Sequence, residues 1–256
     1  MTQTVRFSSI RGPELVGALE VPTDGVRGWG VFVHGFTLGK ESPAAFRISR
    51  SLAGEGIGML RYDALGLGDS AGDWGDGSFT VKVADAVRAA EFLAARGTPP
   101  EILVGHSWGG AAAIVAAQQV PSIRAVVTIG APSEPSEVER HYDAIVDRVL
   151  EQGSGTWLIG GKALTMKRDF VEDVRRADLI GHVRALDRPL LIMHSPTDAT
   201  VDIDNASEIF RAALHPRSFV SLEGSDHFLT VDGQAERAAL IISAWADQYL
   251  RTEPVD

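Results

Sequence analysis

The sequence predicts an α/β fold with a mostly parallel eight-stranded sheet, and three observations lead to that class. Short apolar runs of strand length alternate with longer helical patterns along most of the chain. After the first two runs, helical stretches separate the strands, which is typical of a parallel sheet with helices on both faces. The length of 256 residues and the 45% hydrophobic content suit one large domain over residues 1–256.

Eight short runs predict the strands of this sheet, because they are apolar, rich in β-branched residues and bounded by turn residues. In chain order these runs are Val5–Ile10, Leu15–Val21, Trp29–Val33, Gly58–Tyr62, Ile102–Gly105, Ala125–Ile129, Pro189–Met193 and Ser218–Leu222.

Five longer stretches predict helices. The clearest is Phe79–Ala95, in which apolar residues recur at the i, i+3, i+4 spacing of one helix face. The others are Pro43–Ala53, Trp108–Gln119, Asp204–Ala213 and Gln234–Leu250. The last six residues, 251–256, are expected to form a frayed tail.

The stretch at about 133–187 interrupts the alternation and predicts a lid insertion. We expect a helix at Val138–Leu150, a loop at 153–155, a hairpin at Trp157–Lys167 and a helical run at Arg168–Arg184. A segment of about 54 residues is small for an independent domain, so a lid is the preferred interpretation.

Composition excludes several classes of function. The chain has 24 Lys and Arg against 34 Asp and Glu, and a net charge of −10 disfavours nucleic-acid binding. It contains no Cys, which excludes disulfides, thiol nucleophiles, thiolate zinc sites and iron–sulfur clusters. No apolar run reaches the ~18 residues of a membrane span, and no apolar leader opens the sequence. The sequence therefore predicts a cytoplasmic protein, and it leaves the oligomeric state open.

Ser107 is the predicted nucleophile. It has Gly105 and Gly109 at its second neighbours, follows a buried apolar run and opens a helix of small residues. This strand–turn–helix context is the one in which a sharp turn exposes a catalytic serine. Ser70 has the same glycine spacing, but it lies in a loop without a preceding strand, so we expect a turn residue there. For Ser107 the structural alternative is a helix cap.

A serine hydroxyl needs a base, and the base needs an orienting acid. His227 follows the last predicted strand, where open α/β sheets build their sites, and is preferred over His215 as the base. Asp198 follows the preceding strand and is the predicted acid. Its rivals, Asp202 and Asp204, lie nearer a helix start and suit its N-terminus.

The predicted oxyanion donors are the backbone N–H groups of Phe36 and Trp108, which come from the loop after the third strand and from the residue after Ser107. His34 and His194 are expected to hold loops beneath the site. The aromatic residues proposed to line the substrate pocket are Phe36, Trp108, Trp157, Phe170 and Phe228. Neither a P-loop nor a metalloprotease motif occurs, so no cofactor and no metal are expected.

The motifs together resemble the α/β-hydrolase superfamily, in order and over nearly the whole chain. They are Val33-His34-Gly35-Phe36, Asp63-x-x-Gly66-x-Gly68-x-Ser70, Gly105-His106-Ser107-Trp108-Gly109-Gly110, His194-x-x-x-Asp198-x-x-Val201 and Asp226-His227.

A narrower resemblance is to the hydrolase domain of bacterial proteins that fuse such a domain to an OsmC-like peroxidase. The stretches that carry it are Arg47-Ile48-Ser49-Arg50, His194-Ser195-Pro196, Ile203-Asp204-Asn205-Ala206-Ser207 and His215-Pro216-Arg217-Ser218-Phe219-Val220. This chain has no OsmC-like domain and no Cys, so thiol-peroxidase activity does not carry over.

The resemblance implies a triad serine hydrolase without a cofactor, and it implies no particular substrate. We expect a carboxylesterase that acts on a small-molecule ester through Ser107, His227 and Asp198 with a covalent acyl-enzyme. Two alternatives stay open: an acyltransferase or peptidase with the same triad, and a non-catalytic ligand-binding protein on the same fold.

Overall fold

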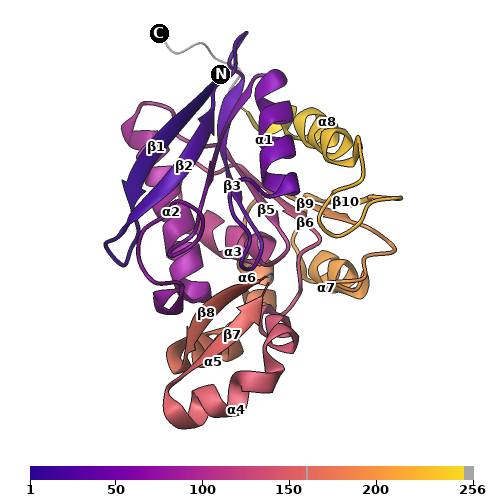
Figure 1. The fold of residues 1–256 in the computed structure, drawn as a ribbon. Coiled ribbons are helices and arrows are strands. Elements are labelled where there is room, and N and C mark those ends of the chain that lie inside the picture. Colours follow the sequence, from indigo (N-terminus) through magenta and orange to yellow (C-terminus); the bar gives the residue numbers. More distant parts are fainter. Residues whose placement is uncertain (160, 251–256) are drawn as a thin grey trace.

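Eight strands form the sheet at the centre of the structure, a computed structural model that describes residues 1–159 and 161–250 (Figure 1). The strand order is β1-β2-β4-β3-β5-β6-β9-β10. β2 runs antiparallel to β1 and β4, and the other neighbours pair in parallel. The bounds are β1 Thr2–Ser8, β2 Glu14–Glu20, β3 Gly28–Val33, β4 Ile57–Tyr62, β5 Ile102–His106, β6 Ala125–Ile129, β9 Leu190–His194 and β10 Arg217–Ser221. The predicted fold class is confirmed.

The eight predicted strands all occur, and the largest difference lies at β1. The apolar pattern predicted Val5–Ile10, whereas β1 covers Thr2–Ser8. Pairing decides this, because Thr2 lies opposite Glu20 and Ser8 lies opposite Glu14. Edge pairing with β2 extends the strand over polar residues that the apolar pattern does not mark.

Helices cover both faces of the sheet, as predicted. α1 (Pro43–Gly54) and α8 (Gln234–Ala246) pack together on one face, and α2 (Phe79–Ala95) and α3 (Trp108–Ala117) pack together on the other. α7 (Asp204–Ala212) lies between β9 and β10 in the chain. Two short 3₁₀ turns, η1 (Trp74–Asp76) and η3 (Asp247–Tyr249), precede α2 and follow α8. The predicted tail at 251–256 lies outside the described residues.

The segment between β6 and β9 forms a small lobe beside α2 and α3 (Figure 1). It contains η2 (Pro135–His141), α4 (Asp143–Gln152), the antiparallel pair β7 (Ser154–Ile159) and β8 (Lys162–Lys167), α5 (Arg168–Arg176) and α6 (Leu179–Ala185). The predicted hairpin occurs. Its side chains Trp157 and Met166, with Phe170 and Val171 of α5, are buried in the apolar cluster that also contains α3.

Three predicted bounds in this segment are wrong. The helix predicted at Val138–Leu150 is divided, because Tyr142 leaves helical geometry (φ −140°) between η2 and α4. No loop separates the two elements at 153–155. Gly153 ends α4 in the left-handed backbone conformation, and β7 begins at the next residue. The run predicted at Arg168–Arg184 is two helices, because Ala177 is extended and the Asp178 side chain caps α6 by accepting the Gly181 N–H at 2.8 Å. Apolar spacing marks helical residues and misses these caps.

Within the described ranges, no helix combines the length and the apolar character that crossing a membrane requires.

Candidate active site

Ser107 lies on a sharp turn between β5 and α3, as the sequence predicted. Its backbone is in the left-handed region (φ 54°, ψ −130°), where a non-glycine residue is strained. Gly105 and Gly109 allow this turn because the backbones of strand, turn and helix lie too close together there for a side chain. A Cβ at Gly105 would lie 2.3 Å from the Gly109 carbonyl oxygen, and one at Gly109 would lie 2.1 Å from that of Val33. The turn therefore presents the serine hydroxyl at the carboxyl edge of the sheet.

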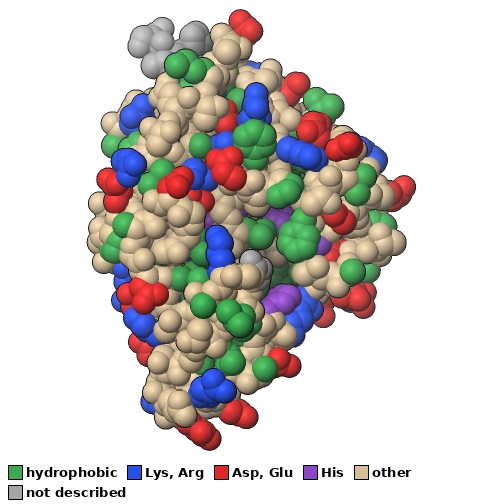
Figure 2. All heavy atoms as spheres, in the orientation of Figure 1, with side chains coloured by type: hydrophobic (Ala, Val, Ile, Leu, Met, Phe, Trp, Pro, Cys, Tyr) green, Lys and Arg blue, Asp and Glu red, His purple; other side chains and the backbone are tan. Residues whose placement is uncertain are grey.

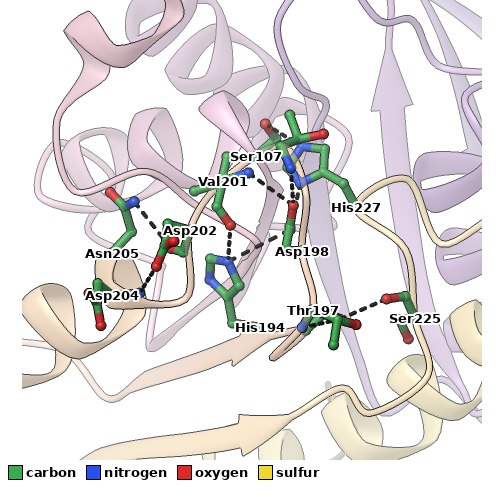
Figure 3. Close-up of polar contacts among 12 residues, drawn as sticks. Ser107, His194, Thr197, Asp198, Val201, Asp202, Asp204, Asn205, Ser225 and His227 are labelled. Carbon is green, nitrogen blue, oxygen red and sulfur yellow. Dashed lines mark hydrogen bonds and ion pairs between the residues drawn. The ribbon is translucent and has the colours of Figure 1, made fainter.

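The structure brings Ser107, His227 and Asp198 together from three loops (Figure 3). His227 lies in the loop after β10, and its Nε2 is 3.0 Å from Ser107 Oγ. Its Nδ1 is 2.7 Å from Oδ2 of Asp198, which lies in the loop after β9. All three loops follow the carboxyl ends of parallel strands, where sites of open α/β sheets form.

The Asp198 carboxylate is held as an anion with a defined orientation. Its Oδ1 accepts the backbone N–H groups of Thr200 at 2.8 Å and Val201 at 2.9 Å, which leaves Oδ2 for His227. Burial by itself raises the pKa of Asp198, but the hydrogen bonds from His227, Val201 and Thr200 outweigh burial and lower it. An ionised Oδ2 requires a proton on His227 Nδ1, so Nε2 is the free base that faces Ser107.

The rival acids lie elsewhere. Asp202 and Asp204 sit at the start of α7, away from His227 (Figure 3), and Asp202 Oδ1 accepts the Asp204 N–H at 2.9 Å. Asp226 adjoins His227 in sequence, but it is half-buried and its carboxylate accepts the Thr230 N–H at 2.8 Å within a turn. None of these three carboxylates contacts the base.

Three buried histidines hold the loops of the site. His34 Nε2 accepts the Ala64 N–H at 3.1 Å, and its Nδ1–H donates to the Gly35 carbonyl at 2.8 Å. His194 Nε2–H donates to the Val201 carbonyl at 2.9 Å. Both structural roles were predicted. His106 was missed: its Nε2–H donates to the His227 carbonyl at 2.7 Å. Burial, with the neighbouring His227, lowers the pKa of His106 to about 3, so it is neutral.

The two predicted oxyanion donors are both available. Trp108 is the first residue of α3, where a backbone N–H has no helical acceptor. The N–H of Phe36 makes no hydrogen bond within the part of the chain that the structure describes. The loop of Phe36 lies against the nucleophile, since a Cβ at Gly35 would be 3.2 Å from the Ser107 Cβ.

A pocket of about 340 Å³ opens onto Ser107 and His227. In Figure 2, histidine and apolar side chains gather at a hollow between the small lobe and the rest of the molecule. Phe36 and Phe228 line the pocket, as predicted. Sequence reasoning missed several other lining residues, among them Leu38, Leu67, His141, Ile159, Lys162, Leu164 and Thr200. Most of these belong to the small lobe or to loops, and no local motif marks them.

The remaining predicted pocket residues lie behind Phe36. Trp108 and Phe170 line a second, smaller cavity. Trp157 lines neither space, because it is buried against Phe36, with ring centroids 5.7 Å apart, and against Tyr142 at 5.8 Å. The prediction of Trp157 as a pocket residue is therefore corrected to a packing role.

Gly130 is a residue of the site that sequence reasoning missed. It follows β6 with φ +57°, and a Cβ there would lie 3.3 Å from both Asp198 Oδ2 and His227 Nδ1. A side chain at this position would crowd the bond between acid and base. A glycine directly after a strand was the available signal.

Nothing among residues 1–159 and 161–250 forms a group of three or more histidine or acidic side chains suited to a metal ion.

Comparison with known proteins shows the family of this chain. Residues 31–240 match the alpha/beta hydrolase family, so the chain belongs to that family. The crystal structure of the esterase domain of a Rhodothermus marinus protein is 38% identical, with a TM-score of 0.78 and coverage of 97% of this chain and 99% of that one. None of the curated proteins matches the chain significantly.

Two more distant structures share the fold. The alpha/beta hydrolase GrgF from Penicillium sp. sh18 is 16% identical, with a TM-score of 0.80 and coverage of 98% and 99% of the two chains. Est1E from Butyrivibrio proteoclasticus, solved with ferulic acid bound, is 17% identical, with a TM-score of 0.75 and coverage of 96% and 98%.

Proposed function

We propose that this chain is a serine hydrolase that cleaves carboxylic esters of small molecules through Ser107, His227 and Asp198. The observation that carries the proposal is the pair of contacts on one imidazole, 3.0 Å to Ser107 Oγ and 2.7 Å to Asp198 Oδ2. Ligand binding alone does not require a serine in a strained backbone conformation with an oriented imidazole beside its hydroxyl. The similarity to an esterase domain supports the ester as the substrate class.

In the first half-reaction, Ser107 Oγ attacks the acyl carbon while His227 Nε2 takes its proton. The negative charge that develops on the carbonyl oxygen is stabilised by the N–H groups of Phe36 and Trp108. The Asp198 carboxylate stabilises the imidazolium, which then protonates the leaving alcohol. An acyl-enzyme on Ser107 remains.

In the second half-reaction, His227 Nε2 takes a proton from water, and the hydroxyl oxygen attacks the acyl carbon. The tetrahedral intermediate uses the same two N–H donors. Its collapse releases the carboxylic acid, and the imidazolium returns a proton to Ser107 Oγ. We also propose that the segment at about 133–187 acts as a lid, because His141, Ile159 and Lys162 from this segment line the pocket of Ser107.

The decisive test is the mass of the intact protein after exposure to a fluorophosphonate, which phosphonylates activated serines. We expect one adduct on the wild type and none on Ser107→Ala. Ser70→Ala is the matched control, since Ser70 has the same glycine spacing. Its hydroxyl instead donates to the Asp63 carbonyl at 2.7 Å and accepts the Val16 N–H at 2.9 Å. Ser70→Ala should keep the adduct.

Folded wild-type protein without an adduct, and without turnover of any ester above the Ser107→Ala background, would reject the proposal and favour a binding protein. Product analysis with a competing alcohol or amine separates hydrolysis from the alternatives. Transfer of the acyl group to the competitor in preference to water would indicate an acyltransferase, and cleavage of amides in preference to esters would indicate a peptidase.

A further inference from the structure

A second cavity, of about 30 Å³, lies behind Phe36. Aromatic rings form much of its wall, namely Phe36, Trp74, Trp108 and Phe170. Phe36, Thr37 and Leu67 line both this cavity and the pocket of Ser107, so the two spaces adjoin at these residues. The cavity is therefore placed beside the reacting centre, on the side of the two predicted oxyanion donors.

Lys82 brings an amine to this apolar cavity. The residue lies in α2 and is only 6% exposed, and its Nζ is 5.8 Å from the centroid of the Trp108 ring. Apart from this ring contact, Lys82 Nζ makes no hydrogen bond or ion pair within the described part of the chain. Burial lowers the pKa of Lys82 to about 7, against the opposing effect of Asp85.

Asp85 also lines the cavity, but its carboxylate is already engaged. It accepts the Ser9 hydroxyl at 2.8 Å and the Ile10 N–H at 2.8 Å, and it forms no ion pair with Lys82 among the described residues. The cavity thus combines apolar walls with one amine for which the described residues supply no hydrogen-bond acceptor. An amine in apolar surroundings is stabilised by a hydrogen-bond acceptor, and a ligand oxygen in the cavity would supply one.

The volume limits what can enter. A water needs about 10–15 Å³ by this measure, so the cavity takes two or three heavy atoms. An acyl chain bound at Ser107 would have to extend past Phe36, which lines both spaces, to place a short tail in the cavity. An oxygen at the end of that tail would meet Lys82.

We propose that this cavity is an acyl-end subsite, in which Lys82 selects short acyl groups that carry an acceptor oxygen, a ketone or a carboxylate, at their far end. The inference rests on the proposed ester hydrolysis and names its substrate class. Lys82 is a specificity-determining residue here and takes no part in bond making.

Three ethyl esters of nearly equal size test the subsite: ethyl pentanoate, ethyl 4-oxopentanoate and monoethyl succinate. The hydrolysis of each ester is measured through the protons that it releases. The first has an apolar tail, the second a neutral ketone and the third a carboxylate. We expect kcat/KM for the two oxygenated esters to exceed that for ethyl pentanoate by about 10-fold or more, the effect of one hydrogen bond to a charged group. If only monoethyl succinate is hydrolysed faster than ethyl pentanoate, Lys82 recognises the acyl end through an ion pair. If both oxygenated esters are hydrolysed faster, it recognises the acyl end through a hydrogen bond.

The matched variants are Lys82→Met and Lys167→Met. The first replaces the amine by an apolar chain of similar length, and the ratio of kcat/KM between oxygenated and apolar esters should fall about 10-fold. The second changes a partly exposed lysine that pairs with Asp76 outside both spaces, and the ratio should stay that of the wild type. Fluorophosphonate labelling checks that each variant is folded and active, and Lys82→Leu replaces Lys82→Met if that variant does not fold.

The outcomes separate the two proposals. Wild type that labels on Ser107 and hydrolyses ethyl pentanoate, but shows no preference for the oxygenated esters, overturns the subsite and leaves ester hydrolysis intact. A preference that survives in folded Lys82→Met or Lys82→Leu overturns the assignment to Lys82. Wild type that neither labels nor hydrolyses any ester overturns both proposals.

Discussion

Replacing Asp198 by Asn tests the proposed mechanism through the tautomer of His227. In the wild type, Asp198 Oδ1 accepts the N–H groups of Thr200 and Val201, and Oδ2 accepts the proton of His227 Nδ1 at 2.7 Å. An asparagine keeps the two backbone N–H groups satisfied only if its carbonyl oxygen takes the place of Oδ1. Its NH₂ group then faces His227 Nδ1.

This exchange inverts the hydrogen bond. Nδ1 must now accept a proton from the amide, so the ring proton moves to Nε2, which lies 3.0 Å from Ser107 Oγ. A protonated Nε2 cannot take the serine proton. We expect kcat to fall about 10⁴-fold, the order of magnitude for a triad left in the wrong tautomer. That factor corresponds to about 5.4 kcal/mol of transition-state stabilisation.

The assay is steady-state hydrolysis of a short aliphatic ester, with the rate of fluorophosphonate labelling as a second readout. Asp226→Asn is the matched control, because Asp226 adjoins His227 in sequence while its carboxylate accepts the Thr230 N–H. It should change kcat less than about 3-fold, as expected for a substitution outside the triad. Folded Asp198→Asn with kcat within about 10-fold of the wild type would refute the tautomer argument, and Asp202 and Asp204 would then be tested as the acid.

Three further predictions concern the support of the site. The pKa of Asp198 is lowered in the folded state, so its stabilising effect is complete above the ordinary pKa of about 3.9 and is lost as pH falls through the folded value. The difference in unfolding free energy between wild type and Asp198→Asn should therefore shrink in urea titrations as pH drops below about 4, and a difference independent of pH would contradict this. Gly130→Ala places a Cβ 3.3 Å from Asp198 Oδ2 and His227 Nδ1. It should lower kcat about 10- to 100-fold. The control is Gly97→Ala, where φ is +77° and a Cβ would meet nothing within 4 Å. It should leave kcat unchanged and lower only the free energy of unfolding, by about 1–3 kcal/mol of backbone strain, in thermal unfolding. His106→Leu leaves the His227 carbonyl without its donor and should reduce the unfolding free energy by about 1–3 kcal/mol, and unchanged stability would show that this bond contributes nothing.

Local chemistry explains why much of the site was predictable. The turn at Ser107 requires small residues at 105 and 109, because strand, turn and helix pack within a few residues of one another. His227 and Asp198 were predictable for a related reason, since each follows a strand in a sheet whose carboxyl edges meet. The narrower resemblance to OsmC-type fusion proteins stays a prediction.

Long-range packing explains what was missed. The roles of His106 and Gly130 depend on contacts with residues distant in sequence, namely the His227 carbonyl for His106 and the Asp198–His227 pair for Gly130. Lys82 likewise reaches its cavity through packing that no spacing rule describes. Trp157 was misjudged for the same reason, because an aromatic side chain in a hairpin is equally suited to a pocket wall or to a cluster such as that around Phe36.

The sequence by itself determined the order of strands and helices along the chain and the class of the fold. It also identified Ser107 and Asp198 as the residues that contact the imidazole of His227. These follow from periodicity and from turn chemistry, which act over a few neighbours along the chain. Tertiary structure alone decided the two backbone N–H groups that orient Asp198, the division of the small lobe into short helices and the cavity that Lys82 lines. Each of these depends on distances between segments that are remote in sequence, and those distances are set only when the faces of the sheet are covered.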